Sequence, residues 1–370
     1  MLVMILTAVA VGFFALIATG QYRRATSHPH LDENGKPNLT SYYFFVIVCV
    51  AILATVAGLR HYVGADYGGY YWRYPNWSAE LEERFREWDE PGLSVIARLL
   101  SFFTDDGAYF ILLISVITIT FTIFPMSKHT DDFFMSVMLY IFTGCWDVTF
   151  NAVRQCVAAA IIFAGHRLIY ERKFIKFCIL VFIAASFHIS ALIMLPLYFL
   201  VTKNLNFQKI AFIMIAGVAL SFSYDFIFSA LGVATGEETV GTSQYAQNEI
   251  NPLRVGIAFA PVILYLFHYL QKKQFSGEEN FYISMLFINA SLIFATANSA
   301  YLHRVTIFFT PFICIAMVSL TTKFDHKQHF LMKSLILILY AIVWYFASLA
   351  SMEEWQWIFQ RTTDFYAKYM

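Results

Sequence analysis

The sequence predicts an all-α protein that crosses a membrane many times. Hydrophobic residues make up 59% of the chain and charged residues only 14%, and the mean hydropathy is +0.60, which excludes a soluble domain. Apolar runs long enough to cross a hydrocarbon core ~30 Å thick recur along the chain. Backbone groups in lipid must pair within their own segment, which favours helices, and the alternating pattern of a membrane barrel is missing.

Ten apolar segments are each predicted to form one transmembrane helix. They are residues 2–19, 42–59, 108–124, 133–150, 152–170, 207–231, 253–270, 281–297, 302–320 and 331–349. A further stretch, residues 174–201, holds His188, Ser190 and Pro196 in its middle. It is either one kinked span or a hairpin of two half-length helices. We therefore expect about 11 or 12 helices in a single membrane domain over residues 1–370.

The distribution of basic residues favours the hairpin. If residues 174–201 enter and leave by one face, that face collects every Lys except Lys368, as cytoplasmic loops do. Both termini are then outside. The opposite, periplasmic face carries the remaining basic residues, which are nearly all Arg. Because Arg recognises phosphate or carboxylate with two donors at once, this face is suited to hold an anion.

Three Arg residues lie near the predicted starts of helices on the periplasmic face. Arg154 and Arg254 each come three residues after an Asn, Asn151 and Asn251, so each is expected at the third helical position behind an N-cap. Arg304 repeats the arrangement more loosely. A cation there opposes the helix dipole unless an anion is near, and amides at a helix start attract anions. The sequence thus indicates either a diphosphate cradle or separate structural ion pairs.

The longest predicted periplasmic loop, residues 60–107, is rich in Tyr and Trp, whereas a later one, residues 232–252, is short. Residues 78–103 are predicted to form an amphipathic helix on the membrane surface, broken at Glu90-Pro91-Gly92. An aromatic belt at the interface would explain the Tyr and Trp residues alone. The first part of the loop also suits stacking on sugar rings and hydrogen bonding to their hydroxyls, through Asp66, Tyr67, Tyr70, Tyr71 and Trp72.

Four short motifs resemble those of EpsG-type, Wzy-like polysaccharide polymerases. The motif R-x-x-V-G-A-D-x-x-x-Y at Arg60 is similar to the family's R-x-x-V-G-T-D-x-x-x-Y, with Ala65 where Thr is usual. E-P-G at Glu90, N-x-x-R-Q at Asn151 and F-H-x-S-A at Phe187 follow in the family's order and spacing. The resemblance covers residues 42–320, and the terminal helices match only as hydrophobic spans.

This resemblance implies a GT-C-like glycosyltransferase that joins undecaprenyl-diphosphate-linked oligosaccharide repeat units on the periplasmic side of a bacterial inner membrane. Such an enzyme must neutralise the charge that develops on its diphosphate leaving group, and it needs a base for the acceptor hydroxyl. We expect His188 or Asp66 as the base, although His188 could also be a buried histidine that marks a hairpin turn. Glu90 is expected to join Tyr67, Tyr70, Tyr71 and Trp72 in binding sugar. The expected diphosphate ligands are Arg60, Arg154 and Arg304, with Arg254 in reserve.

Three other functions are compatible with this composition: an O-antigen ligase, a single-sugar GT-C transferase and a lipid-linked oligosaccharide flippase. A flippase should show broken helices at matching places in two halves, but only residues 174–201 look broken. A ligase should have its largest outer loop late in the chain. The scattered His residues and the lack of a phosphate-binding loop predict no metal, cofactor or nucleic-acid partner. Membrane lipids, a chain-length regulator and a flippase are the expected partners of lipopolysaccharide or exopolysaccharide synthesis.

Overall fold

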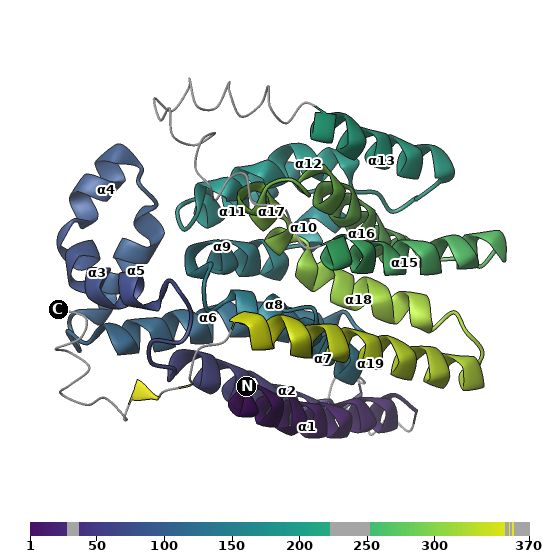
Figure 1. Cartoon of the computed structure of the whole chain (residues 1–370), viewed down its shortest axis with the longest axis horizontal. Helices are drawn as coiled ribbons and strands as arrows, with labels where there is room; N and C mark the ends of the chain where they lie inside the picture. The colour runs from purple at the N-terminus through teal and green to yellow at the C-terminus, as the bar shows by residue number, and fades with distance from the viewer. Residues whose placement is uncertain (28–36, 223–251, 352–354, 356, 359–370) are drawn as a thin grey trace. The chain divides into compact units, whose positions relative to one another are not determined.

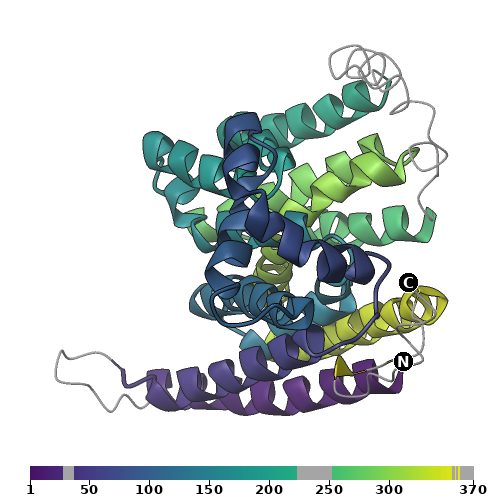
Figure 2. The ribbon, with the colours of Figure 1, turned by 90° about the vertical axis from the view of Figure 1, so that its left-hand side faces the viewer.

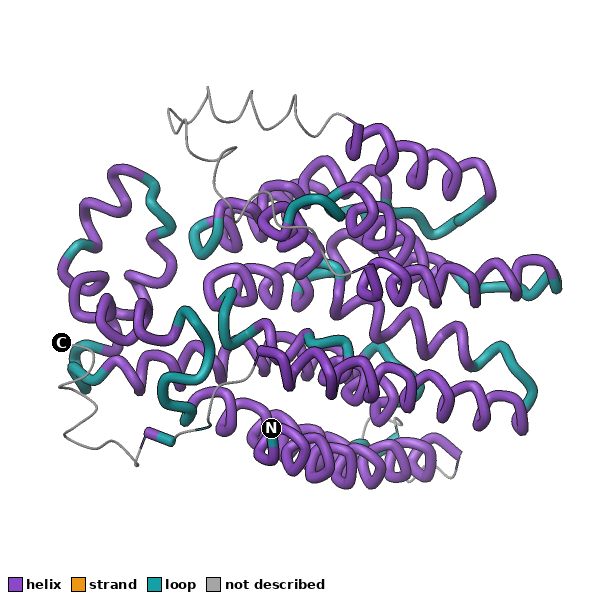
Figure 3. The backbone as a smooth tube through the Cα atoms, viewed as in Figure 1, coloured by secondary structure: helices purple, strands orange, loops and turns teal. Residues whose placement is uncertain are grey.

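The computed structural model describes residues 1–27, 37–222, 252–351, 355 and 357–358. Apart from isolated bridges, this part of the chain contains helices and no β-strand (Figure 3). Four of its helices are long and apolar enough to cross a membrane: α1 (Leu2–Ser27), α2 (Thr40–Gly58), α6 (Gly107–Lys128) and α19 (His326–Ser351). They contain or closely match the spans predicted at 2–19, 42–59, 108–124 and 331–349. The chain is an all-α polytopic membrane protein.

Several predicted spans are interrupted. Residues 133–150 divide into α7 (Phe133–Phe142) and α8 (Cys145–Val148) at Gly144, whose φ of 76° favours glycine. Residues 152–170 divide into α9 (Val153–Ala164) and α10 (Arg167–Tyr170). The prediction of a single helix over 302–320 was also wrong, because the segment forms α17 (Ala300–His303), η2 (Arg304–Phe308) and α18 (Thr310–Thr321). Apolar composition marks a segment that can lie in lipid, but it does not locate the turns within it.

Three further helices follow the sequence prediction more closely. Residues 207–231 begin as α13 (Phe207–Phe222), and 253–270 and 281–297 correspond to α15 (Pro252–Leu270) and α16 (Gly277–Ala295). A capping box at Ser276 and Glu279 starts α16. The predicted loop at 232–252 lies outside the described residues except for Pro252.

The segment 174–201 is a hairpin. Arg172, just before its first helix, donates hydrogen bonds to the carbonyl of Tyr198 at 3.0 Å and to that of Val201. The rings of Phe174 and Tyr198 lie 5.1 Å apart between centroids. The two ends of the segment therefore meet, which confirms the hairpin and excludes one kinked span. Its elements are α11 (Phe174–Ala185), η1 (Ile189–Ile193) and α12 (Met194–Leu200).

The residues group into two compact units, each described by itself. Unit 1 comprises Met1–Gly165, Cys178–Leu192 and Leu331–Met370, and unit 2 comprises His166–Phe177 and Ile193–Phe330. In unit 1, α1 and α2 lie side by side (Figures 1 and 2), α2 packs against α6, and α1 against α7. In unit 2, α16 packs against α13, α15 and α18. The single domain over residues 1–370 stays a prediction.

The predicted loop at residues 60–107 folds into three short helices of unit 1 (Figure 1). Tyr67, Tyr70, Tyr71 and Tyr74 recur at helical spacing and are buried, so they pack the first of these helices against its neighbours. Trp88 and Glu90 both have a positive φ, which confirms the break predicted at Glu90-Pro91-Gly92. The helices are α3 (Tyr67–Ala79), α4 (Leu81–Glu87) and α5 (Pro91–Leu100).

Candidate functional site

In unit 1 the E-P-G motif contacts the start of the F-H-x-S-A motif and Ser186, the residue that precedes it. The Gly92 amide donates to the Ser186 carbonyl at 2.7 Å. A Cβ at Gly92 would lie 2.8 Å from the Ser186 hydroxyl oxygen and 2.9 Å from the Phe187 ring, closer than real Cβ atoms approach. Only glycine permits this approach without displacement of the neighbours. The contact brings Glu90 beside His188.

Glu90 is the centre of a three-residue cluster. Its Oε1 accepts hydrogen bonds from Nδ1 of His188 at 2.5 Å and from the Ile189 amide at 3.1 Å. Its Oε2 accepts a hydrogen bond from Arg154 at 2.5 Å. The side chain of Glu90 is 11% exposed, against 27% for His188 and 41% for Arg154. The carboxylate is therefore enclosed, while the two basic groups can reach a ligand.

The backbone and charge of Glu90 are both unusual. Its φ of 47° places a non-glycine residue in the left-handed region, which costs about 1 kcal/mol or more and is common where function requires strain. Burial works against ionisation, but the hydrogen bond from His188 and the charge of Arg154 outweigh it and hold the pKa of Glu90 below its ordinary value. Glu90 is thus a carboxylate at neutral pH and can only accept. The proton in the hydrogen bond must therefore lie on Nδ1 of His188, and Nε2 is the ring nitrogen that does not contact Glu90.

Tyr70 links the first motif to the same cluster. Its hydroxyl is hydrogen-bonded to Arg154. Burial raises the pKa of Tyr70, and the nearby charge of Arg154 opposes this rise while that of Asp66 adds to it. Tyr70 therefore stays a neutral phenol at neutral pH. Arg154 is held between a phenol and a carboxylate that come from two different motifs.

The N-x-x-R-Q motif is anchored by its Asn. Ala152 is the N-cap of α9, so the expectation that Asn151 caps this helix was wrong, and Arg154 is its second residue rather than its third. The Asn151 Oδ1 instead accepts the Ala65 amide at 2.8 Å. Gly64, with a φ of 95°, makes the close approach to residue 151 possible. Asn151 thereby ties the first motif to the helix that carries Arg154.

Arg60 is buried and held by backbone carbonyls. Its exposed fraction is 1%, and its guanidinium donates to Val63 O at 3.0 Å, to Phe150 O at 3.3 Å and to Ala57 O. It also lies 4.8 Å from the centroid of the Phe150 ring. Burial lowers the pKa of Arg60 to about 10, so it stays charged at neutral pH. This geometry favours a structural role, and diphosphate binding by Arg60 stays a prediction.

The remaining predicted sugar-binding residues differ in accessibility. Tyr67 and Tyr71 are buried with their rings stacked 6.0 Å apart. Trp72 is 41% exposed and donates to the Tyr62 hydroxyl at 2.7 Å. Asp66 is the N-cap residue of α3 but does not cap it with its side chain. Of the four aromatic residues predicted to bind sugar, Trp72 is the exposed one, and sugar binding by all four stays a prediction.

Arg304 and Arg254 both belong to unit 2. Arg304 is the first residue of the short helix η2. Arg254 is the third residue of α15, as expected, but its side chain lies outside the described residues. Their roles as diphosphate ligands stay predictions. No group of three His, Cys, Asp or Glu side chains in the described ranges is arranged to hold a metal ion.

Sequence reasoning missed Asp147, an acid within a predicted apolar span. Its Oδ2 accepts hydrogen bonds from the Trp344 indole at 2.8 Å and the Ser348 hydroxyl at 2.9 Å. These bonds connect α8 to α19 within unit 1. A lone acid in an otherwise apolar segment was the available signal, because such a group needs polar partners in lipid.

Comparison with protein families gives an independent view of the same motifs. A family model described as the EpsG family matches residues 42–360, a range that contains all four motifs. Searches of curated proteins and of solved structures found no match. The family match covers most of the chain, from the second long helix to the C-terminal region. The chain therefore belongs to the EpsG family.

Proposed function

We propose that this chain is a polysaccharide polymerase: a glycosyltransferase that joins undecaprenyl-diphosphate-linked oligosaccharide repeat units into O-antigen or exopolysaccharide on the periplasmic side of a bacterial inner membrane. Membership of the EpsG family supports the polymerase role. The observation that carries the chemistry is the cluster of His188, Glu90 and Arg154, which unites a candidate base, its orienting carboxylate and a candidate anion ligand.

In this proposal His188 is the general base. Glu90 holds the imidazole through Nδ1 and leaves Nε2 to accept the proton of an acceptor sugar hydroxyl. As the hydroxyl oxygen attacks the anomeric carbon of the donor, the imidazole becomes positively charged, and the carboxylate beside it stabilises that charge. Asp66 is the alternative base, or an anchor for a sugar hydroxyl. The acceptor positions of Glu90 are largely occupied by its partners, so orientation is its main task.

Arg154 has the complementary task of receiving the leaving group. The bond between the anomeric carbon and the diphosphate oxygen breaks, and the lipid diphosphate departs with the electron pair. A guanidinium has five N–H donors, and the hydrogen bonds to Glu90 and Tyr70 leave others on a side chain that is 41% exposed. These donors suit a phosphate oxygen. The positive charge of Arg154 would stabilise the negative charge that develops on the diphosphate as its bond to the anomeric carbon breaks. Arg304 and Arg254 are proposed as further diphosphate ligands.

The proposal is tested by electrophoresis of surface polysaccharide from a deletion strain that carries wild type, Arg154→Ala or Arg86→Ala. Arg86 is a matched control, because its side chain is 74% exposed and its carboxylate neighbour is 3.9 Å away. Wild type and Arg86→Ala should restore a ladder, whereas Arg154→Ala should leave single repeat units at equal protein levels. Full-length polymer that is unattached in the deletion strain would indicate a ligase instead. Repeat units trapped inside the cell would indicate a flippase.

A further inference from the structure

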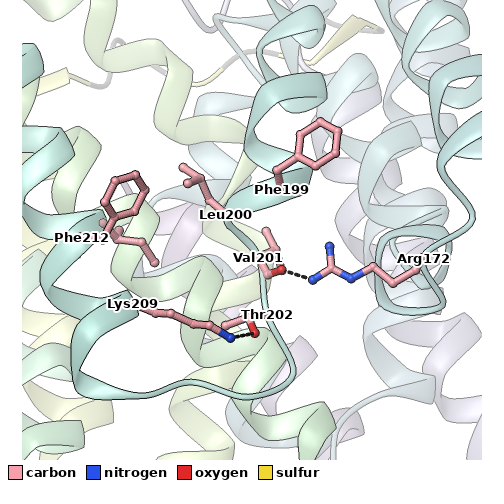
Figure 4. Close-up of a pocket in the computed structure, with 8 residues that line it drawn as sticks. Arg172, Phe199, Leu200, Val201, Thr202, Lys209 and Phe212 are labelled. Atoms are coloured by element: carbon pink, nitrogen blue, oxygen red, sulfur yellow. Dashed lines mark hydrogen bonds between the residues drawn. The ribbon is translucent and has the colours of Figure 1, made fainter.

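The base of the hairpin contains a cavity of about 200 Å³ in unit 2 (Figure 4). It lies where α12 ends and the connection to α13 begins, and Arg172, just before α11, closes one side of it. Arg172 and Lys209 reach toward the backbone around Val201 and Thr202 from opposite sides, and Phe199 lies near one rim. The residues that line the cavity belong to unit 2, whereas the Glu90 cluster belongs to unit 1.

The two cations of this cavity are held by neutral groups. Arg172 donates to the carbonyls of Tyr198 and Val201. Lys209 donates to the Thr202 hydroxyl and to the Asn204 carbonyl, both at 2.9 Å. These acceptors orient the cations without neutralising them. The arrangement therefore keeps two positive charges close to one small cavity.

Within the described ranges no carboxylate pairs with either cation. The nearest acid in sequence, Glu171, is paired with Lys173 at 2.6 Å and with Arg167 at 3.7 Å. A guanidinium has five N–H donors and an ammonium three, so Arg172 and Lys209 both retain donors beyond the bonds described above. Charge and donors together fit an anion with several acceptor oxygens, such as a phosphate group.

Exposed apolar side chains border the same cavity. Phe199 at the end of α12 is 68% exposed, and Phe212 on α13 is 61% exposed. In a membrane protein such rings face lipid chains. A ligand that carries both an anionic group and an apolar chain would contact the two cations and the two rings. A free inorganic anion would contact the cations alone.

We propose that this cavity binds the headgroup of an anionic phospholipid, with its phosphate between Arg172 and Lys209 and an acyl chain along Phe199 and Phe212. The inference does not depend on the polymerase chemistry. The cavity lies at the Lys-rich end of the hairpin, which the charge pattern predicts to be cytoplasmic, and anionic lipids attract basic residues at that surface. The bound lipid would hold the two ends of the hairpin together, while its turn carries His188.

The test measures lipid binding to the full-length protein, purified in detergent, by native mass spectrometry with phosphatidylglycerol, phosphatidylethanolamine or inorganic phosphate. The variants are Lys209→Gln and Arg172→Gln/Lys209→Gln. Lys176→Gln is the control, because Lys176 is an exposed cation of α11 that does not line the cavity. Wild type and the control should bind phosphatidylglycerol about tenfold more tightly than phosphatidylethanolamine, and the double variant should lose this preference.

Each alternative outcome is decisive. Lys209→Gln leaves the hydrogen bonds of Arg172 in place, so it tests the effect of charge even if the double variant unfolds. The unfolding temperature of each variant without lipid shows whether the double variant is folded. Equal binding of the two lipids by wild type, or an unchanged preference in Lys209→Gln, would overturn the proposal. Binding of inorganic phosphate without phosphatidylglycerol would show a free-anion site and also overturn it. Polysaccharide ladders are recorded in a separate experiment. If they show that the chain is not a polymerase, the lipid-binding result still stands.

Discussion

Two carboxylates of unit 1, Asp132 and Glu90, each bind two basic side chains from distant parts of the chain. Asp132 accepts from Arg23 at 3.2 Å and from Lys333. It also caps α7 by accepting the Met135 amide at 3.0 Å. Its side chain is 3% exposed. These contacts join α1, the start of α7 and α19, and Asp132 itself has an ordinary negative φ of −135°.

Glu90 uses the same bonding pattern in a different setting. Its backbone has a positive φ, and one of its partners is an imidazole. Neither feature is needed to fasten two helices, as Asp132 shows. A carboxylate with two basic partners is therefore not by itself a sign of function. A strained backbone and a partner that can take up a proton distinguish the candidate site from the structural clamp.

The largest effect that should separate the two clusters is the loss of activity in His188→Ala. Removal of a general base typically costs 10²–10⁴-fold in rate, so polymerisation should fall by about that factor. The purified variant should stay folded, with its unfolding temperature lowered only by the loss of the hydrogen bond to Glu90. The measurement is transfer of repeat units in membranes, normalised to protein level. His326→Ala, which changes an exposed histidine at the start of α19, should keep wild-type activity; wild-type polymer from His188→Ala would remove that residue from the mechanism.

The second prediction concerns Asp132→Ala, which should lower stability rather than chemistry. Lys333 is only 16% exposed and would lose its carboxylate partner, and breaking a buried pair costs about 3 kcal/mol. Arg23 is 61% exposed and should contribute little. Thermal unfolding in detergent measures the loss, and activity per folded molecule should stay unchanged. The neighbouring Asp131→Ala, an exposed control, should have almost no effect; equal losses from both variants would show that Asp132 is not a clamp.

The sequence predicted the features that depend on local pattern. The four long apolar helices, the break at Glu90-Pro91-Gly92 and the hairpin at 174–201 all follow from neighbouring residues or from Lys and Arg placement, whereas the turns inside the shorter spans do not. The contact of Glu90 with His188 does not, because it joins segments far apart in the chain. For the same reason Asn151 was expected to cap its own helix, whereas the Ala65 amide from another motif takes its side chain.

A smaller effect is expected when the contact between two motifs is crowded in Gly92→Ala. The new methyl group would meet Ser186 and Phe187 at under 3 Å, and such overpacking costs about 1–3 kcal/mol. The shift would move Glu90 away from His188. Polymerase activity per folded molecule should therefore fall, in addition to the loss of stability. Gly69→Ala is the control, since a Cβ there meets nothing within 4 Å. Full activity in Gly92→Ala would mean that the spacing of the two motifs is not critical.

The smallest effect is a change of stability confined to acid pH. The folded-state pKa of Glu90 is lowered relative to the unfolded value of about 4.3. The carboxylate therefore stabilises the fold fully above that value, and this contribution is lost as pH falls through the lower folded-state pKa. Glu90→Gln lacks it at every pH. The difference in unfolding temperature between wild type and Glu90→Gln should be constant near neutrality and should narrow below about pH 4.

The control for this pH series is Glu83→Gln, because Glu83 is 59% exposed and lies 3.9 Å from Arg86. An exposed pair contributes little to stability, so this variant should follow wild type throughout. Asp132 and its ion pairs are the same in all three proteins, so their contribution cancels from each comparison. Any narrowing seen only between wild type and Glu90→Gln must then come from Glu90. A difference that stays constant into acid would mean that Arg154 and His188 do not stabilise the charge of Glu90.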